Sequence, residues 1–209
     1  MKHYPSIPRS TGQNFREFTA YVFDKLDGSN LRAEWTRKGG WGKYGTRERL
    51  FDKTDEVFGE AIEIFKDTLA SSLETVAKRQ QWQQLTIFME FWGDQSFAGL
   101  HIKDDPKRLT LFDANPYKKG ILGPREFLDL FGHLGSLKIP NCFGRIHWTR
   151  GFVEEIRVGK GPTGITFEGV VGKSGEGHHL VMAKAKTQAW INKVLERHGA
   201  EYGQKIINS

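Results

Sequence analysis

The stretch 21-YVFDKLDGSNLRAEW-35 carries the strongest structural signal in the chain. An apolar and aromatic run reaches one lysine, Lys25, and small polar residues then lead to a second run that ends in tryptophan. Asp27-Gly28 is a dipeptide typical of tight turns between strands. The pattern predicts strands over 18–25 and 29–35 that form a hairpin-type pair, with Lys25 at the mouth of the turn.

The composition fits one globular domain. With 209 residues, 38% hydrophobic and 27% charged, the chain can bury one substantial core, so we expect a single domain over 1–209. The net charge of +6 suits a polyanion such as nucleic acid or a nucleotide, although many proteins carry this charge without such a partner.

The single cysteine, Cys142, excludes an internal disulfide, and we expect a buried thiol there. The lack of a long apolar run predicts a soluble cytoplasmic protein without membrane association.

Turn signals and amphipathic stretches divide the rest of the chain. The predicted elements are helices over 53–80, over 124–134 and from Thr187, as N-cap, through Leu195; strands over 85–93, 108–114, 165–173 and 179–186; a loop or ribbon over 38–50; and a helix or strand over 151–159. Hairpins rather than regular βαβ alternation predict an α+β fold with mainly antiparallel sheets.

Four other ionisable residues can act together with Lys25. Lys184 and Lys186 lie two apart in a predicted strand, so they face the same side and suit phosphate oxygens. Nearby cations also lower the pKa of a lysine and make it a nucleophile. Glu168 and Glu90 lie among apolar residues, where a carboxylate is costly to bury unless it binds a cation. Near phosphates that cation would be Mg²⁺ or Mn²⁺. Taken singly, each residue also fits an ordinary surface or ion-paired side chain.

Together and in this order, these residues resemble the covalent nucleotidyltransferase superfamily of ATP-dependent RNA ligases, DNA ligases and mRNA capping enzymes. The matching segments are Lys25-Leu26-Asp27-Gly28-Ser29-Asn30 for motif I, 87-IFMEFWG-93 for motif III, 109-LTLFDA-114 for motif IIIa, 167-FEGVV-171 for motif IV and Lys184-Ala185-Lys186 for motif V. The Ser-Asn ending of motif I is similar to the RNA-ligase-2-like, phage-type group, and 44-YGTRERLFD-52 resembles the arginine-containing motif of those ligases. The resemblance implies a single nucleotidyltransferase (ATP-grasp-like) domain of antiparallel sheets flanked by helices, without an OB-fold.

The resemblance also implies roles for the site residues. Lys25 would attack the α-phosphorus of ATP and form a lysyl-AMP, with Lys184 and Lys186 as catalytic residues that hold the α-phosphate. Glu168 would support Mg²⁺ or Mn²⁺. The remaining nucleotide-binding residues would be Asp27 in the turn that presents the lysine, Asn30 and Arg47 near the ribose or reacting phosphate, Glu90 at the ribose and Phe112 on the adenine. Arg49 is the alternative to Arg47.

The implied activity is that of an ATP-dependent RNA ligase. It would transfer AMP to a 5′-phosphate end of RNA and join that end to a 3′-hydroxyl, as in RNA repair, in the cytoplasm or, for a bacteriophage protein, in the host cytoplasm. The alternatives are a minimal DNA ligase, a capping-type guanylyltransferase and a nucleic-acid-binding module without catalysis. Family ligases usually carry a second domain after motif V, whereas only 187–209 follow here. We therefore expect a minimal ligase, a fragment, or an enzyme that relies on an accessory protein or a homodimer in its place.

Overall fold

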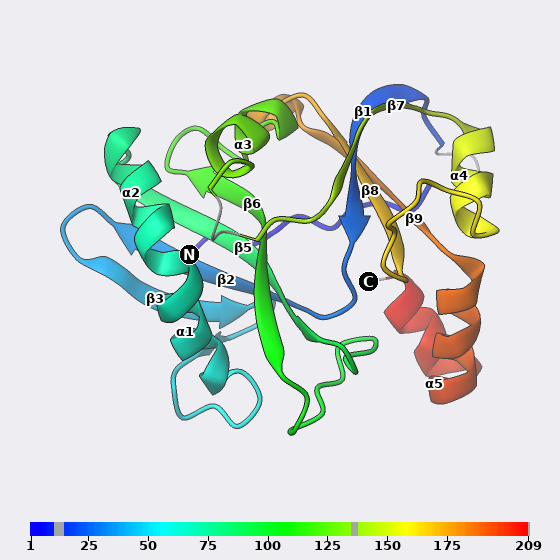
Figure 1. Cartoon of the computed structure of the whole chain (residues 1–209), viewed down its shortest axis with the longest axis horizontal. Coiled ribbons are helices and arrows are strands. Elements are labelled where there is room, and N and C mark those ends of the chain that lie inside the picture. The colour runs from blue at the N-terminus through cyan, green and yellow to red at the C-terminus, as the bar shows by residue number, and fades with distance from the viewer. Residues whose placement is uncertain (11–14, 135–137, 209) are drawn as a thin grey trace. The chain divides into compact units, whose positions relative to one another are not determined.

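Figure 1 shows the computed structural model, which describes residues 1–10, 15–134 and 138–208. The chain divides into two compact units. Unit 1 comprises Met1–Tyr4, Gly28–Ile139 and Glu176–His178, and unit 2 comprises Pro5–Asp27, Pro140–Gly175 and His179–Ser209. Strands and helices mix in the described part of both units and the sheets are antiparallel, so the predicted α+β class is confirmed. The single domain over 1–209 stays a prediction.

Unit 1 is built on a sheet in the order β4-β3-β2-β5-β6. Its strands are β2 (Ser29–Thr36), β3 (Gly40–Thr46), β4 (Leu50–Phe51), β5 (Gln84–Gly93) and β6 (Lys107–Pro116). Its helices are α1 (Gly59–Phe65), the π-helical turn η2 (Lys66–Ala70), α2 (Ser71–Arg79) and α3 (Pro124–Phe131). Apolar residues of these helices, such as Phe65, Leu73 and Phe127, pack with Leu31 and Trp35 of β2 in one buried cluster. The helices therefore cover one face of the sheet.

The other face of this sheet, called here the polar face, carries the alternate residues of β2 and β5. Asn30 pairs with Glu90, and Glu34 pairs with Thr86 across the two strands. The N-terminal segment Met1–Tyr4 also lies on this side, because the main-chain carbonyl of Lys2 accepts a hydrogen bond from Arg32 Nη1 at 3.1 Å. Polar side chains thus collect on the face that the helices leave open.

Unit 2 is built on a sheet in the order β7-β1-β8-β9. Its strands are β1 (Phe18–Lys25), β7 (Cys142–Trp148), β8 (Gly169–Ser174) and β9 (Val181–Lys186). Its helices are α4 (Arg150–Arg157) and α5 (Gln188–Asn208). The short turn η3 (Gly177–His179) follows β8 in sequence, and its first two residues belong to unit 1. Phe152 and Ile156 of α4 pack with Val22 and Trp148 in the core of this unit.

The predicted hairpin of 18–25 with 29–35 is wrong, although both strands exist. β1 pairs with β7 and β8, whereas β2 pairs with β3 and β5 in the other sheet. A Cβ on Gly28 would lie 2.3 Å from the carbonyl oxygen of Phe91, so the main chain runs close against β5 at this point. Residues 26–28 form a bend rather than a hairpin turn, and distant strands supply the sheet partners of both β1 and β2.

Several element boundaries also differ from prediction. The helix expected over 53–80 begins only at Gly59, because Asp55 Oδ1 accepts the main-chain hydrogen bonds of Val57 and Phe58 in a turn. The strand expected over 165–173 begins at Gly169, which leaves Glu168 just before it. The ribbon predicted within 38–50 is confirmed at β3. In the segment 151–159, predicted as helix or strand, residues 151–157 are helical as part of α4.

Two smaller predictions concern Thr187 and Cys142. Thr187 is the N-cap expected, since its hydroxyl accepts from Trp190 N at 3.1 Å, and α5 breaks at Gly199, where φ is 72°. Cys142 is only half-buried rather than buried, and its burial raises the pKa of the thiol. Across the described residues, none of the helices combines the length and apolar character needed to cross a membrane.

Candidate active site

Lys25, Glu168 and Lys186 form a connected charge cluster in unit 2. Lys25 ends β1 and pairs with Gly169 at the start of β8, which brings it beside Glu168. Its Nζ donates to Glu168 Oε2 at 2.6 Å, and Lys186 Nζ lies 2.9 Å from Glu168 Oε1. Strand pairing thus assembles three of the predicted site residues from distant parts of the sequence.

Burial and the neighbouring charges together shift the pKa values of the groups in this cluster. The side chains of Glu168 and Lys186 are 4% and 2% exposed, whereas that of Lys25 is 23% exposed. Burial raises the pKa of the Glu168 carboxyl, but the charges of Lys25 and Lys186 outweigh it and hold that pKa below its usual value. Burial also lowers the pKa of the Lys186 ammonium, and the charges of Lys25 and Arg9 act in the same direction. The cluster therefore keeps a carboxylate ionised and makes another positive charge costly.

Lys184 shares this side of β9 with Lys186. Both are buried, and residues two apart on a strand face the same side. The segment around Arg9 runs along β9, because Lys184 N donates to Pro8 O at 3.0 Å and Ser10 N donates to Lys184 O at 3.1 Å. This pairing was not foreseen, since 8–10 carries no strand pattern.

Asp27 and Trp190 link the turn after Lys25 to α5. Trp190 Nε1 donates to Asp27 Oδ2 at 2.7 Å, and the ring of Trp190 lies 4.1 Å below the Lys186 ammonium. Sequence reasoning assigned Trp190 only to the apolar stripe of a helix. The signal that it missed is an aromatic residue four positions after the motif V lysine, at the first turn of α5.

Asp24 and Thr166 hold the segment before Glu168 against β1. The buried carboxyl of Asp24 accepts hydrogen bonds from both the main-chain nitrogen, at 3.0 Å, and the hydroxyl of Thr166. Burial raises the pKa of Asp24, and these hydrogen bonds oppose that rise. Asp24 is an acidic residue within an apolar strand, and this pattern in the sequence could have identified it as a site residue. These hydrogen bonds tie the residue before Lys25 to the segment before Glu168.

Asn30 and Glu90 lie opposite each other in unit 1. They form a cross-strand pair between β2 and β5, on the polar face, and Thr110 of β6 is the next neighbour of Glu90. Directly opposite residues of an antiparallel pair hold their side chains close together. The structure thus brings these two predicted residues into one polar patch.

Phe112 is half-buried on β6 beside an aromatic group that was not predicted. Tyr4 meets it edge to face, with ring centroids 5.0 Å apart, and Phe88 lies 5.0 Å from Tyr4 on another side. The Tyr4 hydroxyl donates to Asp113 Oδ2 at 2.5 Å, and burial is the main cause of its raised pKa. Tyr4 therefore packs against Phe112, and no local sequence pattern predicted this contact.

The two candidate arginines differ in their surroundings. Arg49 pairs with Asp55 and lies 5.9 Å over the ring of Phe58, so its guanidinium is engaged within the loop. Arg47 is exposed, and its main-chain carbonyl accepts a hydrogen bond from His3 Nδ1 at 2.9 Å. This favours Arg47 as the arginine that can reach a ligand.

A divalent cation would find one buried carboxylate in the lysine cluster. Among the described residues, no group of three or more His, Cys, Asp or Glu side chains is arranged to hold a metal ion. Magnesium ions that act on nucleotides take one or two carboxylates and complete their shell with water and phosphate oxygens. Glu168 fits that role, provided that the lysines move from its oxygens to a bound phosphate.

The sequence matches no family model and no curated protein. Solved structures give clear similarity in fold. An archaeal ATP-dependent RNA ligase superposes with a TM-score of 0.67 at 18% identity, over 94% of this chain and 51% of the ligase. An ATP-dependent DNA ligase candidate from Aquifex aeolicus gives 0.65 at 18%, over 100% and 58%. An RNA ligase variant from Naegleria gruberi, solved with ATP and Mn, gives 0.60 at 17%, over 86% and 52%. The chain spans about half the length of these proteins and shares their fold.

Proposed function

We propose that this chain is the nucleotidyltransferase part of an ATP-dependent RNA ligase that forms a covalent lysyl-AMP at Lys25. The observation that carries the proposal is the Lys25–Glu168–Lys186 cluster, in which a buried carboxylate bridges a partly exposed lysine and a buried lysine. Surface lysines need no such arrangement. The similarity in fold to ATP-dependent ligases supports the same conclusion.

The proposed first step is in-line attack of Lys25 Nζ on the α-phosphorus of ATP. The N–P bond forms as the bond to the bridging oxygen breaks, and pyrophosphate leaves with that electron pair. Lys25 must lose a proton to water before it attacks, and the nearby positive charge of Lys186 favours that loss once Glu168 holds the metal. The buried charges of Lys184 and Lys186 would hold the α-phosphate and stabilise the charge that develops on its oxygens.

The other residues would hold the nucleotide and the metal. Glu168 would be the protein ligand of Mg²⁺ or Mn²⁺, which supplies charge neutralisation at the phosphates. We keep as proposals that Glu90 contacts the ribose, that Phe112 stacks on adenine and that Asn30 and Arg47 contact the ribose or the reacting phosphate. Asp27, held by Trp190, would fix the turn behind the nucleophile.

RNA is the substrate that we favour for the later steps. Transfer of AMP to a 5′-phosphate and attack by a 3′-hydroxyl would complete the joining. Two of the similar structures are RNA ligases, and the Ser29-Asn30 ending of motif I points the same way. DNA ligation is the second candidate, because the Aquifex aeolicus protein aligns along the whole chain. A partner protein or a second copy of the chain would supply further contacts with the nucleic acid.

Label transfer from nucleotide to protein tests the proposal. Wild type, Lys25→Arg and Lys160→Arg would be incubated with Mg²⁺ and α-labelled ATP or GTP, then denatured and resolved. Arginine keeps a cation beside Glu168 but is no nucleophile, and Lys160 is an exposed lysine that serves as the matched control. We expect label from ATP on wild type and Lys160→Arg alone. Label from GTP would favour the capping-type reaction, and no label from a folded wild type would contradict the proposal.

Nicked duplexes then separate the two ligase readings. The adenylated wild-type protein would be given matched nicks with RNA or DNA ends, and sealed product would be measured under single-turnover conditions. We expect faster sealing of the RNA ends. Equal or faster sealing of the DNA ends would replace the RNA assignment and leave the lysyl-AMP chemistry intact.

A further inference from the structure

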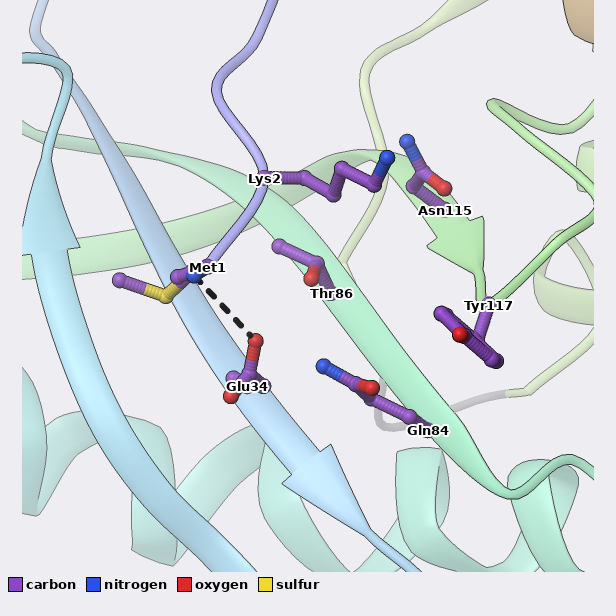
Figure 2. Close-up of a pocket in the computed structure, with 7 residues that line it drawn as sticks. All are labelled: Met1, Lys2, Glu34, Gln84, Thr86, Asn115 and Tyr117. Carbon is purple, nitrogen blue, oxygen red and sulfur yellow. Dashed lines mark ion pairs between the residues drawn. The ribbon is translucent and has the colours of Figure 1, made fainter.

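A pocket lies on the polar face of unit 1, away from the residues assigned to ATP. It has a volume of about 180 Å³ and is lined by Met1, Lys2, Glu34, Gln84, Thr86, Asn115 and Tyr117. Figure 2 shows Glu34, Thr86 and Gln84 beside one another on β2 and β5, with Lys2 extending toward Asn115. Glu34 is four residues along β2 from Asn30, which is about 13 Å on a strand.

Glu34 is a buried carboxylate with an unfilled acceptor. Its side chain is 6% exposed, and its Oε1 lies 3.3 Å from the exposed Lys43 ammonium. Its Oε2 is buried without a hydrogen-bond partner, and the Met1 amino nitrogen is 3.8 Å away, beyond hydrogen-bonding distance. A buried acceptor without a donor costs free energy that a ligand with an N–H group would recover.

The charges around Glu34 argue against a metal ion there. Lys43 and the Met1 amino group already lie within 4 Å of its oxygens, and the buried Arg32 guanidinium also feels its charge. Lys2 adds another cation to the lining. A further cation would meet repulsion from these groups, whereas a neutral N–H donor attached to an anion would be favoured.

The remaining lining residues suit a flat, polar ring. The amides of Gln84 and Asn115 and the hydroxyl of Thr86 each both donate and accept hydrogen bonds. The ring of Tyr117, 55% exposed, lies at the rim and offers an aromatic face. The volume is well below the roughly 300–1,000 Å³ of pockets for drug-sized ligands, so a small group enters and the rest of its ligand stays outside.

We propose that this pocket binds one nucleobase that carries an exocyclic amino group. The amino group of adenine, guanine or cytosine donates to Glu34 Oε2, and the attached phosphate stays outside, near Lys2 and Lys43. Uracil presents a carbonyl at the corresponding position of cytosine and leaves Glu34 without a donor. The pocket is thus a second base-recognition site, and it does not depend on the adenylation chemistry proposed for Lys25.

Paired pyrimidine nucleotides test the proposal, because CMP and UMP differ at the group that faces Glu34. Binding to the full chain would be measured by calorimetry for wild type, Glu34→Gln and Glu201→Gln, an exposed glutamate of unit 2. We expect wild type and Glu201→Gln to bind CMP about tenfold or more tightly than UMP. Glu34→Gln should lose or invert this preference, because its amide can donate to the uracil carbonyl.

Three further comparisons keep the test decisive. Asn115→Ala, at a half-buried position, should weaken CMP binding even if Glu34→Gln fails to fold. Short oligo(C) and oligo(U) show whether the site takes a base within a strand or a free nucleotide. Lys25→Arg should keep the preference for CMP over UMP, and Glu34→Gln should keep label transfer from ATP. These two results would show that the pocket acts independently of the proposed ligase function. Equal binding of CMP and UMP, no binding of either, or a preference that survives Glu34→Gln would overturn the proposal.

Discussion

Lys25 Nζ donates a 2.6 Å hydrogen bond to Glu168 Oε2, although 143 residues separate the two in sequence. The antiparallel pairing of β1 with β8 makes this contact, since Lys25 is opposite Gly169. Lys186 holds the second oxygen of the same carboxylate from β9. One buried carboxylate therefore links the proposed nucleophile to a buried lysine of β9.

Replacement of Glu168 should damage both stability and chemistry. Glu168→Gln leaves Lys186 buried without its ion-pair partner, which typically costs about 3–5 kcal/mol of unfolding free energy. It also removes the carboxylate charge proposed to hold the metal at the phosphates, so we expect label transfer from ATP to fall about 100-fold or more. Urea unfolding and single-turnover labelling measure the two effects.

Glu154→Gln is the matched control for this change. Glu154 pairs with Arg157 at 2.6 Å on the surface of α4, and solvent screens such an exposed ion pair so that it contributes little to stability. Its labelling should equal that of wild type. If Glu168→Gln were as stable and as active as this control, the cluster would contribute neither to stability nor to label transfer.

Stability should depend on pH through His101. Burial is the main cause that lowers the pKa of His101 from 6.5 to about 4, and the ring hydrogen-bonds the Ser29 hydroxyl over 2.9 Å. Between these pH values His101 is protonated in the unfolded chain and neutral in the folded chain. The free energy of unfolding should therefore fall as pH drops from about 6.5 to 4.

Urea midpoints at pH 7, 6 and 5 would show this dependence. His101→Gln should flatten it, whereas His133→Gln, at an exposed position, should leave it unchanged. The same slope in all three proteins would mean that His101 is protonated in the folded state.

Trp190→Phe should slow adenylation while the fold persists. Phenylalanine keeps a ring under Lys186 but loses the 2.7 Å hydrogen bond to Asp27. A hydrogen bond to a charged group contributes about 1.5–3 kcal/mol, so we expect label transfer about tenfold slower or more, through a displaced turn behind Lys25. Trp82→Phe, at a half-buried position of unit 1, is the control and should label normally. Equal rates for the two variants would remove Trp190 from the site.

How far the sequence predicts this structure depends on whether the signal is local. The motif order predicted Lys25, Glu168 and Lys186, and the pairing of β1 with β8 and of β8 with β9 brings them together. The partner of β2 was not predictable, since Asp27-Gly28 specifies a turn but not which strands pair across it. Tyr4 was missed for a related reason: its contacts with Phe88 and Phe112 join the chain start to two distant strands.

Gly28 should not tolerate a side chain. A Cβ there would lie 2.3 Å from Phe91 O, so Gly28→Ala must shift the main chain between Lys25 and β2. We expect lower stability and a loss of labelling of at least tenfold. Gly42→Ala, where a Cβ would have no atom within 4 Å, should behave as wild type in both assays. A fully active Gly28→Ala protein would show that the chain passes β5 less closely than described.

The most direct test of the central claim is to locate the AMP on the chain. The wild-type protein would be incubated with ATP and Mg²⁺, digested, and mapped by tandem mass spectrometry under conditions that preserve the phosphoramide. The account predicts one AMP on Lys25, in the peptide that contains 21-YVFDKLDGSN-30. AMP on Lys184, on Lys186 or on any other residue, or a folded protein that carries none, would contradict it.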